Sequence, residues 1–202
     1  HYQITLNDGS RVWINENSKL IFPAKFASDV REVILEGEAY FEVVPNEKAP
    51  FIVKSQNNSS IRVLGTKFNI NNQGITTYTT LVEGSVEVQS GEEKIVIKPS
   101  EQAIINAEKK GIDVREVDVN FYTSWKDGKF TFKDMSVHEI MSKIGKWYHI
   151  QVEYDNINTQ NILLSGSLRK YETFREIIEV MEATNIVEIK IKNNNTIKIY
   201  KK

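Results

Sequence analysis

The sequence predicts an α+β protein made of two parts. The first is an all-β domain (a sandwich, a barrel-like fold or a solenoid), and the second is a small βαβ–βαββ domain with an internal duplication. Up to about residue 118, short apolar stretches alternate with turn residues about every eight to twelve positions, without helical periodicity. From about residue 129, two amphipathic helix patterns appear, each followed by a strand pattern. The second helix pattern repeats the first 37 residues later.

The N-terminal part opens with a β-hairpin pattern. Two apolar stretches, residues 3–6 and 11–15, flank Asp8-Gly9, a pair that favours a tight hairpin turn. Turns rich in Pro, Gly, Asn and Ser, such as residues 56–60, separate the later strands. Those strands are expected over residues 19–22, 31–44, 51–55, 61–71, 76–89, 94–99 and 101–119.

One of these strands carries three glutamates at even spacing, Glu36, Glu38 and Glu42. Paired carboxylates perform acid–base chemistry in many hydrolases, so a catalytic role is one interpretation. Alternate side chains of a strand point to opposite faces, which places the glutamates with Tyr40 on one face and the apolar residues on the other. We therefore expect the glutamates on a solvated face rather than in an active site.

A related pattern occurs twice in this part. Residues 35–43 read LEGEAYFEV, and residues 82–88 read VEGSVEV. Gly37 and Gly84 stand inside these strands, where glycine serves a bulge or a close backbone approach. The recurrence favours a structural module, because an active site would be unique.

The C-terminal part begins with a strand over residues 129–134 and a helix over 136–149. Ser136 and Glu139 form the S-x-x-E capping box, and Thr173 and Glu176 form a second one. Each box precedes one apolar stripe at helical spacing. The stripes are Val137, Ile140, Met141 and Ile144, then Phe174, Ile177, Ile178 and Met181. Further strands are expected over 150–154, 162–170, 187–191 and 196–202, with a turn at 193–195 before the last.

Composition excludes several classes of function. The chain has 202 residues, 40% of them hydrophobic, and a net charge of −1, which argues against a nucleic-acid surface. No apolar run approaches the length of a membrane span, and no leader precedes the first strand. We expect an excised fragment of a longer protein. The absence of cysteine removes disulfides and thiolate chemistry.

No catalytic, cofactor-binding or metal-binding residues are predicted. His138 and His149 stand eleven residues apart, about 16 Å along a helix, too far to share a metal ion. The sequence contains no H-E-x-x-H, no phosphate-binding glycine loop and no G-x-S-x-G. We therefore expect exposed histidines, no cofactor and no enzymatic activity.

Aromatic residues suggest a surface for a protein partner. Trp125 is expected to pack at the junction of the two parts, and Trp147 to extend the apolar stripe of its helix. Alternatively, tryptophan and tyrosine side chains anchor protein interfaces. The last strand is a candidate edge that a partner strand could extend, although its lysines could equally protect it. The candidate partner-binding residues are Trp147, Tyr148, Ile197, Ile199 and Tyr200.

Several motifs occur in an order that resembles the periplasmic part of FecR-type anti-sigma factors. They are LNDGSRVWINENSKLIFP, REVILEGEAYFEV, FIV, VLGTKFNI, TLVEGSVEV and KPSEQA. The stretch WKDGKFTFKDMSVHEIMSKIGKWYHIQVEY and the residues after it resemble the C-terminal domain of Bacteroidetes members, which is similar to the short N-terminal domain of secretins and TonB-dependent receptors. One departure is Ser100, where the family tends to have glycine, so the type of that turn stays open.

The resemblance implies a regulatory protein with two domains, residues 1–120 and 121–202. It implies a periplasmic sensor region of a single-pass inner-membrane protein, whose membrane helix and cytoplasmic sigma-binding segment lie outside this sequence. An outer-membrane TonB-dependent transducer would present its signalling domain to the sensor. Regulated proteases would then free an extracytoplasmic-function sigma factor. The rival hypotheses are a carbohydrate-binding or glycan-processing β-module that uses Glu36, Glu42, Tyr40 and Tyr78, and an assembly domain like those of secretins.

Overall fold

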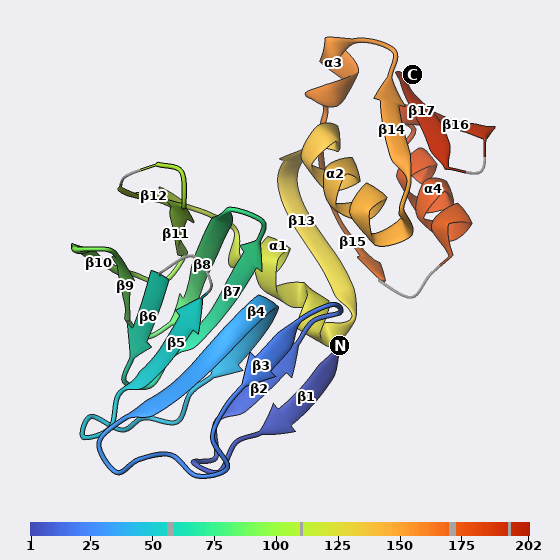
Figure 1. Ribbon diagram of the computed structural model, residues 1–202. Helices are drawn as coiled ribbons and strands as arrows, with labels where there is room; N and C mark the ends of the chain where they lie inside the picture. The colour runs from blue at the N-terminus through green and yellow to red at the C-terminus, as the bar shows by residue number, and fades with distance from the viewer. Residues whose placement is uncertain (56–58, 110, 170–172, 194) are drawn as a thin grey trace. The chain divides into compact units, whose positions relative to one another are not determined.

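The computed structural model describes residues 1–55, 59–109, 111–169, 173–193 and 195–202 (Figure 1). Parts of the expected turns at 56–60 and 193–195 lie outside the described residues. The chain forms two compact units, His1–Lys126 and Asp127–Lys202. The predicted α+β class is confirmed, with an N-terminal unit dominated by strands and a C-terminal unit of mixed strands and helices.

The N-terminal unit holds one twelve-stranded sheet, in which the strands of the main path run in the order β10-β9-β6-β5-β4-β7-β8-β11-β12. β2 also pairs with β4 and carries β1 on its other side, and β3 pairs with β4. The strands are β1 (Tyr2–Thr5), β2 (Arg11–Ile14), β3 (Lys19–Ile21), β4 (Arg31–Glu42), β5 (Phe51–Ser55), β6 (Ser59–Val63), β7 (Lys67–Gln73), β8 (Thr76–Glu83), β9 (Val86–Ser90), β10 (Glu93–Ile97), β11 (Glu101–Asn106) and β12 (Ile112–Glu116).

β4 belongs to both halves of this sheet. Its residues 31–35 pair with β5, and its residues 37–42 pair with β7. Gly37 stands at the change of partner, with a φ of +87°, and a Cβ there would lie 2.4 Å from the Ser18 Oγ atom. Gly84 separates β8 from β9 with a φ of +96°. The repeated Glu-Gly pattern therefore marks the places where the chain crosses from one half of the sheet to the other.

The core of the N-terminal unit lies on the apolar faces of its strands. Phe41 of β4 and Phe68 of β7 are fully buried, and their rings stack with centroids 5.0 Å apart. Phe51 of β5 meets Phe41 edge-on at 6.2 Å. These rings come from strands that are neighbours in the sheet, so the alternation read from the sequence places them on one face.

The opposite face of β4 is less exposed than we expected. Glu36 and Glu42 are partly exposed, but Glu38 is 9% exposed and Tyr40 is 3% exposed. The expectation of a solvated face was therefore wrong for Glu38 and Tyr40. The reason is that this face of the sheet is covered by the polypeptide that follows β12, namely helix α1 (Val119–Thr123) and the 3₁₀ turn η1 (Ser124–Asp127).

The C-terminal unit contains the predicted order of strands and helices. The elements are β13 (Lys129–Ser136), α2 (Val137–Tyr148), β14 (Gln151–Tyr154), α3 (Ile157–Gln160), β15 (Leu163–Arg169), α4 (Phe174–Ala183), β16 (Val187–Asn193) and β17 (Thr196–Lys201). Both capping boxes are formed, at Ser136 and Thr173. Of the two apolar stripes, every member except Phe174 is buried. The short α1, η1 and α3 were not predicted, because four or five residues carry no periodic signal.

The described residues of this unit form two sheets. β13 pairs with β15 in an antiparallel pair, and a second sheet has the order β14-β17-β16, with β14 parallel and β16 antiparallel to β17. Helix α2 packs against both β13 and β14, and α4 packs against β16. The prediction that the last strand forms an edge was wrong, because β17 is hydrogen-bonded on both sides (Figure 1).

Candidate functional site

The three glutamates of β4 do not converge on one point. Glu42 forms an ion pair with Arg11 of β2, and Glu36 lies 3.9 Å from the Lys19 ammonium. Glu38 is held by neutral donors instead. Its carboxylate accepts hydrogen bonds from the Asn15 amide at 2.8 Å and the Asn69 amide at 3.0 Å.

These contacts are explained by sheet structure, since each partner lies on a neighbouring strand or at its end. Nothing in this arrangement directs two carboxylates at a common substrate, and therefore the glutamates give no support to the glycan-processing alternative.

The histidines are also dispersed. His138 lies in the first turn of α2, with its ring 5.8 Å from that of Tyr154. His149 caps the end of α2 in the left-handed conformation, with a φ of +53°. Both are exposed. Among the described residues, no group of three or more His, Asp and Glu side chains is placed to hold a metal ion.

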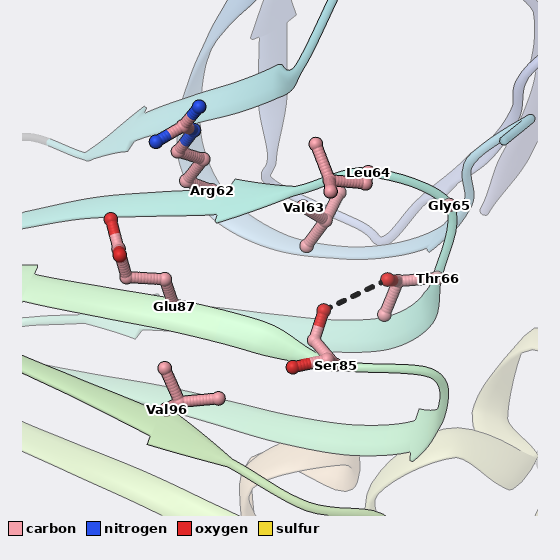
Figure 2. A pocket seen from close by; sticks show the side chains of 8 residues that line it. All are labelled: Arg62, Val63, Leu64, Gly65, Thr66, Ser85, Glu87 and Val96. Atoms are coloured by element: carbon pink, nitrogen blue, oxygen red, sulfur yellow. Dashed lines mark hydrogen bonds between the residues drawn. The ribbon is translucent and has the colours of Figure 1, made fainter. Parts of the chain in front are cut away.

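A shallow hollow lies where β6 runs into β7 (Figure 2). Its volume is about 290 Å³, and its lining residues include Arg62, Leu64, Glu87 and Val96. Glu87 lies opposite Arg62 in the sheet and 3.7 Å from the Lys94 ammonium. The Glu87 carboxylate thus has two cationic neighbours, Arg62 and Lys94.

Three of the lining residues, Gly65, Thr66 and Ser85, lie in closely packed backbone. The Thr66 hydroxyl donates to the carbonyl of Ser85 at 3.0 Å, as the dashed line of Figure 2 shows. A Cβ at Gly65 would lie 2.6 Å from the Cα of Pro45, and one at Gly84 would lie 3.0 Å from the carbonyl oxygen of Gly65. The glycines here permit the crossing between the halves of the sheet.

Two of the predicted partner-binding residues end helix α2. The ring of Trp147 meets Phe130 of β13 edge-on at 5.3 Å, and Tyr148 lies 5.6 Å from Phe174 of α4. Both side chains are half-buried. They pack inside the C-terminal unit and keep an exposed part, so contact with a partner remains a prediction for them.

The other three predicted residues lie on β17. Ile197 is 1% exposed and Ile199 is fully buried, so their side chains belong to the core. Tyr200 is half-buried on the opposite face, between the ammonium groups of Lys190 and Lys198, which lie 5.0 and 5.3 Å from its ring centroid. Of these three, Tyr200 alone presents side-chain surface to a partner, and that role remains a prediction.

A groove between α2 and β14 is a site that sequence reasoning missed. Its volume is about 340 Å³, and its lining residues include Met141, Gly145 and Val152 between polar groups such as His138 and Lys146. A Cβ at Gly145 would lie 2.8 Å from the carbonyl oxygen of Ile150, so glycine lets the helix approach the strand. No periodic pattern marks such a groove, although the glycine inside a helix was a signal that could have pointed to it.

Tyr154 also lines the groove, at the end of β14. Burial raises the pKa of Tyr154 to about 12. The phenol therefore stays neutral at physiological pH, and Tyr154 adds no charge to the lining of the groove.

The two edges of the three-stranded sheet differ in protection. On β16, the backbone N–H of Ile189 donates to the Glu182 carboxylate at 2.7 Å, so a side chain already occupies that position. On β14, the N–H groups of Gln151 and Asp155 point to β17, so those of Val152 and Tyr154 point to the open edge. The described part of the chain provides no comparable cap on β14.

None of the described helices has the length and apolar character that a membrane span requires.

The chain is similar to known protein families and to solved structures. The model of a family described as "FecR protein" matches residues 1–87, and the model described as "FecR, C-terminal" matches residues 129–199. Two crystal structures, at 1.65 and 2.50 Å resolution, of a protein assigned as an anti-sigma factor in Parabacteroides distasonis ATCC 8503 superpose with TM-scores of 0.73 and 0.72. Each is 26% identical in sequence and covers 100% of this chain and 94% of its own. No curated protein matches.

The fold and these matches together define the class of the protein, which is an anti-sigma regulator. Within that class the chain belongs to the FecR family. The resemblance stated from the sequence motifs is thereby confirmed.

Proposed function

We propose that this chain is the periplasmic sensor region of a membrane-anchored anti-sigma factor, and that it acts by protein–protein recognition without catalysis. The observation that carries the proposal is the open edge of β14 beside the groove on α2. An exposed edge offers unpaired backbone groups, and an adjacent groove can accept alternate side chains of an added strand.

The proposed partner is the signalling domain of an outer-membrane TonB-dependent transducer. A strand of that domain would pair with β14 and place an apolar side chain over Met141 and Val152. Lys146 and the two histidines at the rim would favour acidic residues at the ends of that strand. Trp147, Tyr148 and Tyr200 are proposed as further contacts of the partner.

The remaining steps of the proposal concern the whole protein. Docking of the loaded transducer would lead regulated proteases to release an extracytoplasmic-function sigma factor, which would be held by a cytoplasmic segment outside these 202 residues. The division into a FecR-like domain (residues 1–120) and a secretin-like short domain (residues 121–202) remains a proposal, and the two compact units divide six residues later, between Lys126 and Asp127.

The test is titration of the chain with the signalling domain of its cognate transducer, followed by calorimetry or NMR. Val152→Pro removes an outward-pointing N–H and places a ring on the open edge, a position where proline is tolerated. We expect it to weaken binding about tenfold or more, the effect of losing about 1.4 kcal/mol of contacts.

The matched control is Ile191→Pro on the opposite edge. Ile191 is 61% exposed, and like Ile189 its N–H points away from β17. Binding should persist in this variant. Absence of binding at millimolar concentrations would contradict the docking proposal, and equal weakening by both prolines would contradict the choice of β14.

A further inference from the structure

The segment that covers the outer face of the N-terminal sheet rests on a continuous row of side chains. Each member of the row lies directly opposite the next one on the neighbouring strand. Paired residues of neighbouring strands share a face, so the row crosses six strands in a line. In order, the cross-strand row is Trp13, Tyr40, Asn69, Thr80, Gln102 and Arg115.

Residues 119–126, here called the clasp, comprise helix α1 and most of η1, and α1 packs on β8 (Figure 1). The Trp125 indole N–H donates to the Asn69 amide oxygen at 3.2 Å. The Arg115 guanidinium donates to the Tyr122 hydroxyl at 3.0 Å. The Lys126 ammonium lies 5.2 Å from the ring centroid of Tyr40. The clasp thus meets the row at three separate points.

The row is polar in its centre although it is buried. Asn69 and Thr80 are each 1% exposed, and Gln102 is fully buried. Their side chains are bonded along the row, with the Gln102 amide donating to the Thr80 hydroxyl at 2.7 Å. The Asn69 amide donates to Glu38 at 3.0 Å, so the contact of Trp125 continues to a buried carboxylate.

This composition decides what happens when the clasp leaves. The inner face of the same strands carries Phe41, Phe68 and Leu81, whose exposure to water would be costly. Amides, hydroxyls and carboxylates on the outer face can exchange their partners for water. Removing the clasp therefore exposes two buried aromatic side chains of its own, Phe121 and Trp125, together with polar groups that water satisfies.

We infer that residues 119–126 form a releasable clasp, which opens locally while the twelve-stranded sheet stays folded. The clasp is also the covalent connection, because the second compact unit begins at Asp127. Released and extended, these eight residues span about 27 Å, against about 12 Å as a helix. Opening would thus lengthen the connection between the twelve-stranded sheet and the C-terminal unit.

The docking event proposed above is one signal that could use this switch, but the opening itself is a property of the chain alone. Native-state hydrogen exchange of the whole chain in increasing urea tests it directly. The Ser124 N–H, which donates to the carbonyl of Asn120, reports the clasp, and the amides of β4 report the sheet. We expect clasp amides to exchange with little dependence on urea, because a local opening exposes little surface.

Two variants address the contacts that hold the clasp. Asn69→Ala removes the acceptor of Trp125 and should speed exchange of the clasp about tenfold, since a buried hydrogen bond is lost. Tyr122→Phe removes only the hydroxyl that Arg115 reaches, and should give a several-fold increase without risk to the fold. Asn71→Ala, two residues along the same face of β7, is the control and should leave the clasp unchanged.

The wild-type urea series decides the matter even if Asn69→Ala fails to fold. Clasp amides whose exchange depends on urea as steeply as that of β4 would show that the clasp opens only on global unfolding, and would overturn the inference. Equal effects of Tyr122→Phe and Asn71→Ala on clasp exchange would equally overturn it.

Discussion

Arg31 shows how a single buried charge holds distant segments of the N-terminal unit. It is 3% exposed, and its guanidinium donates to the carbonyl oxygens of Val44 and Ala49 and, at 2.8 Å, to the Asp8 carboxylate. Its Nη2 atom is buried without a partner among the described atoms. Removing one member of such a pair leaves the other charge uncompensated, which is why these contacts are sensitive to mutation and to pH.

Stability should fall at low pH through Asp8. Burial alone would raise the pKa of Asp8, but hydrogen bonds from Ser10 and Arg31 outweigh burial and hold that pKa below its ordinary value. A carboxyl whose pKa is lower in the folded state stabilises fully above its unfolded pKa, about 3.9, and loses that contribution as pH falls through the folded value.

Urea unfolding between about pH 7 and pH 2 measures this contribution. Asp8→Asn should lower the free energy of unfolding at neutral pH by about 1.5–3 kcal/mol, as expected for a hydrogen bond to a charged group. The variant should also lose less stability on acidification than the wild type. Parallel pH profiles for the two proteins would contradict this assignment.

The structure shows which turn contains Ser100, the position where the sequence departs from the family pattern. The Glu101 N–H donates to the Lys98 carbonyl at 3.0 Å, and Ser100 has a φ of +70°. With Pro99 at the second position, this is a type II turn, in which the third position favours glycine. The turn type left open by the sequence is therefore the one that the family's glycine suits.

Ser100→Gly should stabilise the chain. Relief of a left-handed conformation is worth about 1–2 kcal/mol, and the added freedom of glycine in the unfolded state removes about 0.5–1 kcal/mol of it. The expected gain in the free energy of unfolding is about 0.5–1 kcal/mol. Ser90→Gly, at the last residue of β9, is the control and should destabilise instead. A loss of stability in Ser100→Gly would contradict the turn.

At the scale of elements, the glycines at the sheet crossings matter more than those in ordinary turns. Gly37 and Gly84 combine a positive φ with close neighbours, whereas Gly91 has a φ of +59° and no atom within 4 Å of the position that a Cβ would take. At the crossings, both the positive φ and the lack of room for a Cβ disfavour other residues. In the turn, only the positive φ does. Comparing the two kinds of site separates the two costs.

Gly37→Ala should therefore cost much more than Gly91→Ala. A Cβ at Gly37 would lie 2.4 Å from Ser18 Oγ and 2.9 Å from Ser18 Cα, so β4 or the turn that leads into β3 must shift. We expect a loss of about 3 kcal/mol or more for Gly37→Ala and about 1 kcal/mol for Gly91→Ala, measured by urea unfolding. Similar losses would show that the φ requirement dominates and that the close approach relaxes easily.

At the scale of the whole molecule, residues 121–126 belong with the first compact unit. Trp125 is 1% exposed and contacts Asn69 and His1, which both lie in the N-terminal unit. We expected Trp125 at the junction of the two parts only because of its position in the sequence. The predicted boundary after residue 120 precedes the end of the first compact unit by six residues.

Two fragments test where the first unit ends. Residues 1–126 should fold cooperatively, because they include the clasp and the sheet. Residues 1–118 lack Trp125 and should be less stable by about 3–5 kcal/mol, the usual cost of removing a buried tryptophan. Urea unfolding of both fragments provides the measurement, and equal stability would show that the clasp contributes nothing to the sheet.

Local pattern was sufficient to predict much of this protein. Most strands, the two capping boxes, the duplicated helices and the family follow from alternation, spacing and motif order, because these depend on residues close together in the chain. The expected strands over 61–71, 76–89 and 101–119 were wrong in extent, because each of these ranges holds two strands. Which strands pair, which strand lies at an edge and which polar face is buried depend on contacts between residues far apart. The sequence predicts solvated side chains for Glu38 and Tyr40, but a segment about eighty residues later covers them. The sequence also suggests an edge for β17, but β14 and β16 flank that strand. Tertiary structure alone decided these features, since the sequence of a strand does not determine which of its faces is covered or which of its edges is paired.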